Sequence, residues 1–436
     1  MNKSKKINLG IIGLGNIGSY FCNEISKSIN DIKLKTGVDI NIKYVSAKNR
    51  FKKRIYKIKK NQWVKKPLDI TKDDSIDIVV ELIGGSDGLA KSVVESALKN
   101  KKHVITANKS LIAKHGNYLS RLAEKNNVNL EFEASVAGGI PIIRSIKEGL
   151  ASNKIFKIVG ILNGTSNYIL SKMNEEGKAF SDVLKTAQKS GYAETDPSSD
   201  INGEDVESKI RILSALCFKS KISNNTILRN GIEDIEINDI KITKKLGYRI
   251  KLLGFSEIIN KKIFERVHPA LVKNNSYIAN INGVYNAIII NGTPIGQTIL
   301  QGEGAGPGPT TSSLISDLYS ILRGNIKNPF IINSNKRKSI NFFNVNEYSY
   351  ECYFRFNVKD VPGVLSSITS SLAKNKISIK SLIQNPVKKN NTASIIIISH
   401  LTKEKNVSQC LKNIQKNKNV IKKPTFIRIS NINEDW

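Results

Sequence analysis

The chain has 436 residues, more than one compact core ordinarily holds, so its length predicts about two to four domains. Hydrophobic residues make up 40% and charged residues 24%, and no apolar run reaches the roughly 18 residues of a transmembrane helix, which argues against a membrane protein. The net charge of +31 comes from lysines scattered along the whole chain, without aromatic platforms or a zinc or helix-turn-helix signature, and therefore does not predict a nucleic-acid binder.

The N-terminus passes from MNKSKK directly into an apolar strand at residues 7–12, so we expect no signal peptide and a cytoplasmic location. The strand runs into GLGNIG and then a helical pattern to Ile25, the order of strand, turn and helix that a dinucleotide-binding fingerprint requires. Its glycines permit the tight turn and the close approach of the pyrophosphate to the helix N-terminus. The predicted cofactor contacts are Gly13, Leu14, Gly15, Asn16, Ile17 and Gly18.

The second predicted strand, residues 42–47, ends where the adenosine ribose of the cofactor should lie. An acid at this point would hold the 2′-hydroxyl of NAD, but the sequence has Lys48 and Arg50 instead. Arg50 can pair with a 2′-phosphate, which favours NADP over NAD. Because the chain is rich in lysine throughout, a basic residue here by chance is the competing interpretation, and NAD stays open.

Two further strands, at residues 76–83 and 103–106, flank a helix at 88–99 and predict βαβ alternation with a parallel sheet. Gly84 and Ser86 follow the first of these strands, and Lys109 follows the second. Ligands lie beyond the carboxyl ends of parallel strands, so all three residues are candidates for cofactor contact. A solvated loop lysine is the alternative for Lys109.

A strand predicted at residues 130–134 leads into the glycine-rich bend at 135–141. One acid, Glu133, together with several outward-turned carbonyl groups, suits a hard cation. From spacing alone, a plain loop is the simpler interpretation.

The stretch GYAETDPSSDINGEDVESK, residues 191–209, gathers carboxylates in a loop that ends in a predicted helix. Asn202 is the predicted N-cap, and the apolar residues that follow have helical spacing. Asp205 and Lys209 are four residues apart and therefore share a face of this helix. Without further context they would be an exposed ion pair, contributing a few tenths of a kcal/mol.

The last part of the chain has strand patterns at 263–269 and 285–290, the glycine-rich run 301–310 and a helix at 311–322. The glycine run is either a domain linker or a turn that closes on a cofactor. Residues 324–348 are rich in Asn, Lys and Ser and predict a linker. Beyond them, strands and helices alternate in βαββαβ order over residues 349–430, which predicts a ferredoxin-like module.

Several motifs occur together and in order: GLGNIGS, TANK at 106–109, EASVAGGIP at 133–141, NGTSNYIL at 163–170, the 191–209 stretch and GEGAGPGPT at 302–310. With them, the chain resembles the monofunctional homoserine dehydrogenases that carry a C-terminal ACT domain. The resemblance implies an α/β protein with a Rossmann-type nucleotide-binding domain at 1–137 that also includes a helix near 306–323. It further implies an α+β catalytic and dimerisation domain at 138–305 and an ACT regulatory domain at 349–430 after the linker.

The resemblance also implies roles for individual residues. Lys209 is the expected catalytic acid/base and Asp205 its substrate-holding partner. The substrate-binding candidates are Glu194, Asp200, Asp205 and Lys109. The later cofactor contacts are Gly191, Gly302 and Glu303, the sodium ligands are Glu133 with the carbonyl groups of Val136, Gly138 and Ile140, and the effector site is the turn with Asp360, Gly363, Val364 and Leu365.

The function implied is the NAD(P)H-dependent interconversion of L-aspartate 4-semialdehyde and L-homoserine, on the route to threonine, methionine and isoleucine, by a homodimer or homotetramer. We expect L-threonine to inhibit through the ACT domain, against an ACT domain that only mediates dimerisation. The rival functions are reduction of a different semialdehyde, and a non-enzymatic regulator that senses nucleotides and amino acids. A sensor has no need for Asp205 and Lys209, which argues against the second rival.

Overall fold

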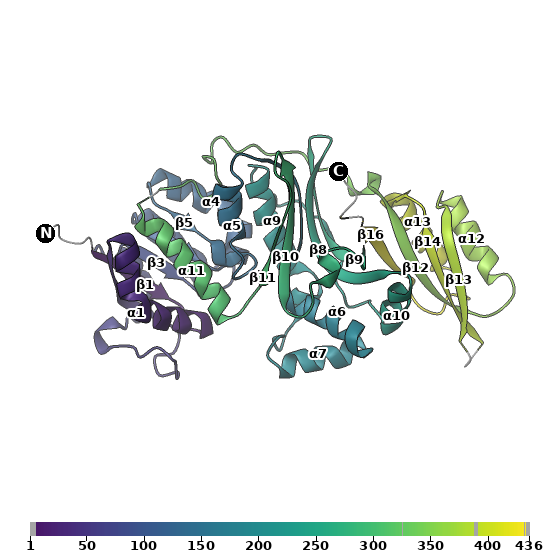
Figure 1. Cartoon of the computed structure of the whole chain (residues 1–436), viewed down its shortest axis with the longest axis horizontal. Helices are drawn as coiled ribbons and strands as arrows, with labels where there is room; N and C mark the ends of the chain where they lie inside the picture. The colour runs from purple at the N-terminus through teal and green to yellow at the C-terminus, as the bar shows by residue number, and fades with distance from the viewer. Residues whose placement is uncertain (1–5, 325, 388–390, 431, 433–436) are drawn as a thin grey trace.

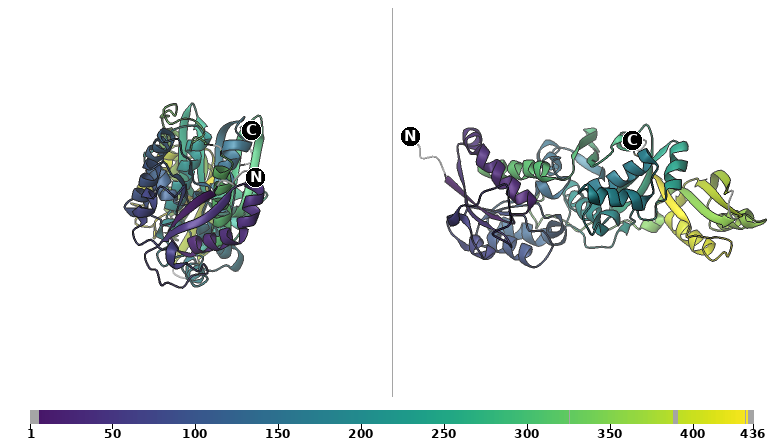
Figure 2. Two further views of the ribbon diagram at one scale, coloured as in Figure 1. Left: turned by 90° about the vertical axis from the view of Figure 1, so that its left-hand side faces the viewer. Right: turned by 90° about the horizontal axis from the view of Figure 1, so that it is seen from below.

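The computed structural model describes residues 6–324, 326–387, 391–430 and 432. The molecule is elongated, with the N-terminal α/β part at one end and the C-terminal module at the other (Figures 1 and 2). Between them lies a broad sheet with helices on one side. Within the described ranges, no helix is both long and apolar enough to cross a membrane.

The N-terminal part is a five-stranded parallel sheet in the order β2-β1-β3-β4-β5, which confirms the predicted βαβ alternation. Strand β3 reads IVVE and is buried at every position, as expected for a parallel strand covered on both faces. Its strands are β1 (Lys6–Ile12), β2 (Asp39–Ser46), β3 (Ile78–Glu81), β4 (His103–Thr106) and β5 (Leu130–Glu131). Its helices are α1 (Asn16–Thr36), α2 (Pro67–Lys72), α3 (Leu89–Lys99), α4 (Lys109–Lys125) and, from much later in the chain, α11 (Pro307–Leu322), which packs beside α1 (Figure 1).

The remaining strands form one 11-stranded mixed sheet, whose main order is β11-β10-β6-β8-β9-β16-β12-β14-β13. Its central strands are β6 (Lys154–Ile161), β7 (Leu228–Arg229), β8 (Tyr248–Ile259), β9 (Lys262–Lys273), β10 (Tyr285–Thr293) and β11 (Gly296–Glu303). The accompanying helices are α5 (Ile142–Arg144), α6 (Gly164–Glu176), α7 (Phe180–Lys189), α8 (Ser198–Ile201), α9 (Glu204–Cys217) and α10 (Ile237–Lys245).

The C-terminal module has the predicted βαββαβ order. It consists of β12 (Ser349–Lys359), α12 (Val364–Lys374), β13 (Ile379–Val387), β14 (Thr392–Ser399), β15 (Thr402–Lys403), α13 (Glu404–Ile414) and β16 (Thr425–Ser430). Its sheet is continuous with the central sheet, because β16 pairs in parallel with β9. The sequence did not predict this continuity.

A buried ion pair reinforces that junction. Arg355 of β12 donates from Nε to Asp239 of α10 at 2.6 Å and from Nη2 to the second carboxylate oxygen at 2.9 Å. The hydroxyl of Tyr353 donates to Asp239 at 3.0 Å. Asp239 and Arg355 are almost entirely buried, so removal of either partner would leave an uncompensated charge in the interior.

Two local predictions differ from the structure. The strand expected at 130–134 ends at Glu131, because the backbone N–H of Glu133 donates to Asp317 of α11 and the chain turns away from the sheet. The N-cap of α9 is Gly203, with φ of 85°, and not Asn202. Asn202 lies one residue earlier, where its side chain accepts from the backbone N–H of Glu204 at 2.9 Å.

Candidate active site

The glycines of the fingerprint occupy three different environments, and each suits a nucleotide. Gly13 follows β1 with φ of 107°, a conformation that other residues rarely adopt. A Cβ at Gly18 would overlap the carbonyl oxygen of Gly13, so only glycine lets α1 start this close to the strand. At Gly15 a Cβ would meet nothing within 4 Å, which leaves open space at the N-terminus of α1 for a pyrophosphate.

The carboxyl ends of β1, β3 and β4 lie at one edge of the parallel sheet and bring Gly13, Gly84 and Lys109 to the same side. Gly84 and Gly85 both have positive φ, and Ser86 follows them with its hydroxyl donating to Asp87 at 2.7 Å. Lys109 is the first residue of α4.

A buried carboxylate that the sequence analysis missed shapes this edge. Glu81, at the end of β3, accepts from the backbone N–H groups of Ile83 at 2.7 Å and Gly84 at 3.3 Å. Its second oxygen accepts from the hydroxyl of Thr106 at 2.6 Å. Burial raises the pKa of Glu81, and these donors oppose the shift. Glu81 therefore fixes the loop after β3 to the end of β4, directly before Lys109.

The predicted pair of Asp205 and Lys209 is buried, and a third residue joins it. Lys209 Nζ lies 2.7 Å from Asp205 Oδ2, and Lys109 Nζ lies 2.7 Å from Asp205 Oδ1. The exposed fraction of the side chain is 3% for Asp205, 10% for Lys209 and 41% for Lys109. Lys209 also donates to the backbone carbonyl of Leu162, at the end of β6, at 2.6 Å. The solvent-exposed ion pair that sequence alone allowed is thus excluded.

The protonation of this cluster follows from burial and from the mutual charges. Burial alone would raise the pKa of Asp205, but Lys209 and Lys109 hold it well below its usual range. Burial lowers the pKa of Lys209, Asp205 opposes this shift, and Lys109 adds to it. The pKa of Lys109 is raised, chiefly by Asp205. Asp205 is therefore ionised and Lys109 charged, while Lys209 gives up its proton more readily than an ordinary lysine.

Asn163 is a second residue that the sequence analysis did not single out. Its side-chain nitrogen donates to Asp200 at 2.7 Å and to Asp205 at 2.8 Å, and its oxygen accepts from the backbone of Ser166 as the N-cap of α6. The NGTSN motif that contains it was the available signal. Asn163 thus holds two carboxylates from the 191–209 stretch side by side.

The other predicted residues of that stretch lie at its surface. Glu194 is exposed, and its charge acts on Lys109. Gly191 is exposed with φ of 74°, and next to it the carbonyl of Tyr192 accepts from Thr165 at 2.8 Å. These contacts place the loop over the N-terminal turn of α6, adjacent to Asn163.

The ribose end of the predicted cofactor site contains exposed basic side chains. Arg50 lies after β2 with its guanidinium 5.9 Å from the ring centre of Trp63. Lys48 is exposed beside it. Arg54, four residues on, donates to the backbone carbonyl of Leu14 at 2.9 Å and so ties this loop to the fingerprint.

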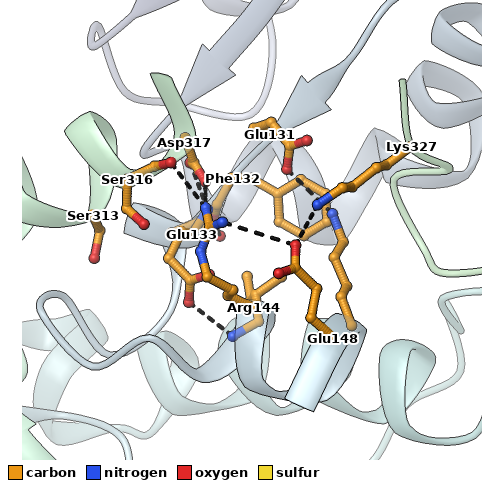
Figure 3. Close-up of polar contacts among 12 residues, drawn as sticks. Glu131, Phe132, Glu133, Arg144, Glu148, Ser313, Ser316, Asp317 and Lys327 are labelled. Atoms are coloured by element: carbon orange, nitrogen blue, oxygen red, sulfur yellow. Dashed lines mark hydrogen bonds and ion pairs between the residues drawn. The ribbon is translucent and has the colours of Figure 1, made fainter. Parts of the chain in front are cut away.

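The predicted cation loop presents several backbone carbonyl groups, and the carboxylate of Glu133 beside them is already hydrogen-bonded. Ala137 and Gly138 have φ of 56° and 54°, which turns successive carbonyl groups in different directions. Both carboxylate oxygens of Glu133 accept from backbone N–H groups of α5, that of Ile143 at 2.8 Å and that of Arg144 at 2.7 Å. Figure 3 shows Glu133 next to Arg144. Burial raises the pKa of Glu133 to about 7. The backbone carbonyl of Glu133 also accepts a hydrogen bond, from the N–H of Val136 at 3.3 Å, so both its carboxylate and its carbonyl can offer a cation only a remaining lone pair.

A buried amide supports this fit. Asn286 pairs with Gly302 across β10 and β11, so their side-chain positions share a face, and Ile140 lies on that face, 3.1 Å from the Cβ position of Gly302. Neither polar atom of the Asn286 side chain has a hydrogen-bond partner, although the residue is fully buried. An unpaired buried amide is costly, and a hard cation or a water in this loop would relieve it. Among the described residues, no group of three or more His, Cys, Asp and Glu side chains forms a metal site.

The glycine run at 302–306 connects β11 of the central sheet with α11 of the nucleotide-binding part. Gly302 and Glu303 end β11, and the Glu303 carbonyl accepts from the backbone N–H of Gly139 at 3.0 Å. Gly306, with φ of 113°, then leads into α11 beside the fingerprint helix. The run thus joins the cation loop to the nucleotide-binding sheet.

The predicted effector turn lies at the opposite end of the molecule from the fingerprint (Figure 1). The backbone N–H of Asp360 donates to the Asn391 carbonyl at 2.8 Å, and Gly363, with φ of 85°, is the N-cap of α12. Val364 is buried and Leu365 packs against the core of the module.

Comparisons with known proteins agree with this arrangement. The family models that match are "Homoserine dehydrogenase, NAD binding domain" over residues 13–133, "Homoserine dehydrogenase" over 141–319 and "ACT domain" over 353–419. The homoserine dehydrogenase of Neisseria gonorrhoeae is 39% identical over 436 residues, covering 99% of this chain and 100% of that protein. The crystal structure of a homoserine dehydrogenase from Thiobacillus denitrificans matches with a TM-score of 0.89 at 36% identity, over 98% of both chains. A hyperthermophilic archaeal homoserine dehydrogenase mutant in complex with NADPH matches with a TM-score of 0.63 at 26% identity, over 74% of this chain and 99% of that one.

Proposed function

Because the chain belongs to the homoserine dehydrogenase family of NAD(P)-dependent oxidoreductases, we propose that it interconverts L-aspartate 4-semialdehyde and L-homoserine with Lys209 as the acid/base. The observation that carries this assignment is the buried cluster of Lys209, Asp205 and Lys109 at the edge of the nucleotide-binding sheet. Two lysines share one carboxylate there, which provides positive charge where an alkoxide would form.

The chain's own residues supply binding, orientation and a proton. The nicotinamide cofactor, when bound, supplies the hydride. Lys209 donates its proton to the aldehyde oxygen as that oxygen becomes an alkoxide, and the lowered pKa of Lys209 favours the transfer. Asp205 and the Leu162 carbonyl fix the direction of the ammonium group. In the reverse direction the neutral amine accepts the proton of the hydroxyl.

The substrate's α-ammonium needs carboxylate partners, and we assign Glu194 and Asp200 to it. Asp200 is held beside Asp205 by Asn163, while Glu194 is exposed on the loop above. Lys109 is more accessible than Lys209 and lies on the other side of Asp205, so we assign it to a substrate oxygen facing the cofactor. The assay that tests this function is NADPH oxidation with L-aspartate 4-semialdehyde and a panel of other aldehydes, including succinic semialdehyde. Equal activity with all of them would contradict it.

We propose that NADPH is preferred over NADH. Arg50 and Lys48 lie at the ribose end with no acid to repel a 2′-phosphate, and one structural relative is described in complex with NADPH. The test compares kcat/KM for the two nucleotides in the wild type and in Arg50→Ala. We expect the variant to lose about tenfold with NADPH, equivalent to about 1.4 kcal/mol, and little with NADH. An equal loss with both nucleotides would reject the assignment of Arg50.

We propose that the loop at 133–140 holds a monovalent cation such as sodium, through backbone carbonyls and next to Asn286. The melting temperature measured in sodium chloride should exceed that in choline chloride at equal ionic strength. Asn286→Leu, which removes the buried amide at similar volume, should reduce this difference. An identical melting temperature in both salts would remove the cation from the proposal.

We propose that L-threonine inhibits through the ACT domain, with the turn at Asp360–Leu365 as the first candidate site. The same domain serving only in assembly into a homodimer or homotetramer is the alternative. Inhibition by L-threonine in the full-length enzyme, weakened in Asp360→Ala, is the expected result. Activity of the full-length enzyme that is insensitive to L-threonine would contradict this proposal and favour the role in assembly.

A further inference from the structure

A cavity lies at the junction between the central sheet and the ACT module, away from the nucleotide site. It has a volume of about 430 Å³, which is ample for an amino acid, and it is lined from both sides of the junction. One wall is the segment 230–236 before α10. The other is the segment 422–428, whose last four residues belong to β16, together with Leu411 of α13 and Gln415 directly after that helix.

The two walls carry opposite charge. Glu233, Asp234 and Glu236 lie on the first wall, and Lys422 and Lys423 on the second. Lys423 lies 2.9 Å from Asp234, and Lys422 lies 3.3 Å from Glu236. Both pairs are exposed, and pairs of this kind contribute only about 0–1 kcal/mol. Glu236 is also paired with the buried Arg355 at 3.2 Å, so Asp234 is the acid that a ligand can release at little cost.

This separation of charge matches a zwitterion. An α-amino acid placed between the walls would direct its ammonium group to the carboxylates and its carboxylate to the lysines, and each charge would find a charge-assisted hydrogen bond. The partly buried rings and chains of Phe426 and Leu411 offer apolar contact for a short side chain. A simple anion or cation would satisfy only one wall.

Residues 230–232, which we call the floor of the cavity, are in direct contact with the segment 200–205, which contains the proposed substrate-binding residues Asp200 and Asp205. The backbone N–H of Ile232 donates to the Ile201 carbonyl at 2.8 Å. A Cβ on Gly231 would overlap that same carbonyl oxygen, and it would come within 2.7 Å of the Cα of Asn202. Asp200 and Asp205 stand on either side of this contact, and Asn163 holds both of them.

The ACT wall is tied to the floor as well. Arg428 of β16 is buried, donates to both oxygens of Glu404 and reaches the side-chain oxygen of Asn230 at 3.3 Å. The backbone N–H of Asn230 in turn donates to the carbonyl of Val267 in β9 at 2.9 Å. Displacement of the 422–428 wall therefore reaches Asn230 and Gly231, and through them the residues that hold the substrate.

We propose that this junction cavity binds a small zwitterionic α-amino acid and that its occupancy shifts the segment 200–205, so that it is a regulatory site separate from the Asp360–Leu365 turn. The inference rests on the proposed homoserine dehydrogenase activity and locates its amino-acid control at a different place. Binding changes the KM for the semialdehyde, because Asp200 and Asp205 move, and leaves the affinity for NADPH unchanged, because the fingerprint belongs to the other sheet.

The test uses the full-length enzyme and isothermal titration with L-threonine, L-methionine and L-isoleucine, each in turn. The cavity variant is Asp234→Asn with Lys423→Met, which neutralises one charge on each wall. The matched control is Lys380→Met, which removes an exposed lysine paired with Glu351 at 2.8 Å elsewhere in the same module. Asp360→Ala reports on the other candidate site.

We expect at least one of these amino acids to bind the wild type, at least tenfold weaker binding in the cavity variant, and wild-type binding in Lys380→Met. The bound amino acid should raise the KM for the semialdehyde severalfold in the wild type and in Lys380→Met, with the dissociation constant of NADPH unchanged. Hydrogen exchange should slow at the amide of Ile232.

Three results would overturn the proposal. Binding that survives in the cavity variant but is lost in Asp360→Ala would place the site at the turn. No binding of any of the three amino acids to an enzyme that reduces the semialdehyde would reject the cavity as a site while the proposed activity stands. An enzyme without semialdehyde reduction would contradict the proposed activity itself, whatever it binds.

Discussion

Asp205→Asn is the substitution that separates a working acid/base cluster from a merely structural ion pair. It keeps the size and one acceptor oxygen of the side chain but removes the negative charge that Lys209 and Lys109 share. Removing one partner of a buried ion pair typically costs about 3–5 kcal/mol. If about 3 kcal/mol of this is lost in the transition state, kcat/KM falls by about 150-fold.

The pH dependence gives the sharper test. Asp205 raises the pKa of Lys209 against the effects of burial and Lys109, so the pKa of Lys209 must fall further in the variant. Aldehyde reduction needs the protonated lysine, and its rate declines as pH rises through that pKa. Homoserine oxidation needs the neutral amine, and its rate rises through the same pKa. In Asp205→Asn, the fall of the reduction rate and the rise of the oxidation rate (the two limbs of the pH profiles) should therefore both occur at lower pH.

The assay is steady-state kinetics in both directions from acid to alkaline pH, with NADPH affinity measured separately by fluorescence. The matched control is Glu207→Gln, on the same helix, which removes an acid paired with Arg211 four residues on at 2.7 Å. We expect the control to keep wild-type kcat and both limbs. A loss of less than tenfold in Asp205→Asn, with neither limb displaced, would refute the assigned role of the cluster.

Three further predictions concern other parts of the chain. Lys209→Ala should lower kcat by about 10²–10⁴ while the dissociation constant of NADPH changes by less than about twofold; equal loss of both would mark a structural role. Glu81→Gln replaces an acceptor oxygen with an amide N–H₂ that faces hydrogen-bond donors. The variant should raise the KM for NADPH and lower the free energy of unfolding in urea by about 1–3 kcal/mol. Unchanged values would show that the loop at Gly84 does not depend on the carboxylate. Arg355→Met leaves the buried Asp239 without its ion-pair partner and should lower the free energy of unfolding by about 3–5 kcal/mol. An unchanged midpoint of urea unfolding would mean that the junction does not depend on this ion pair.

The local part of the active site was predictable because its geometry is set by one helix. Residues four apart on a helix share a face whatever the tertiary structure, so the spacing of Asp205 and Lys209 sufficed. The glycine fingerprint is equally local, since a turn between a strand and a helix places all its residues together. The parallel pairing of the strands in the first sheet followed from the βαβ alternation, whereas their order did not.

The contacts that the sequence did not reveal join residues far apart in the chain. Lys109 reaches Asp205 across about one hundred residues, and Asn163 reaches it from a different helix. The position of Lys109 after a strand made it a candidate for the site, but nothing near it in the sequence indicated contact with Asp205. Glu81 was missed because a single acid at a strand end has no pattern of its own.

The junction between β9 and β16 is a similar case. Its hydrogen bonds join backbone groups, which every residue type except proline provides in full, so no sequence motif predicts them. The sequence therefore predicted only a module that follows a linker, without pairing to the central sheet. Removal of residues from 349 onward would expose the edge of β9 and leave Asp239 without Arg355, so point variants are the appropriate tools for testing regulation.

The charge balance of the active site explains why one carboxylate serves two lysines. A second carboxylate directly between them would neutralise both and keep the pKa of Lys209 high, which would oppose proton transfer. With Asp205 alone, the cluster retains an excess positive charge that an alkoxide can offset. Asp200 and Glu194 influence Lys109 by charge, and Asp200 also acts on Lys209, but among the described residues neither forms an ion pair with Lys209.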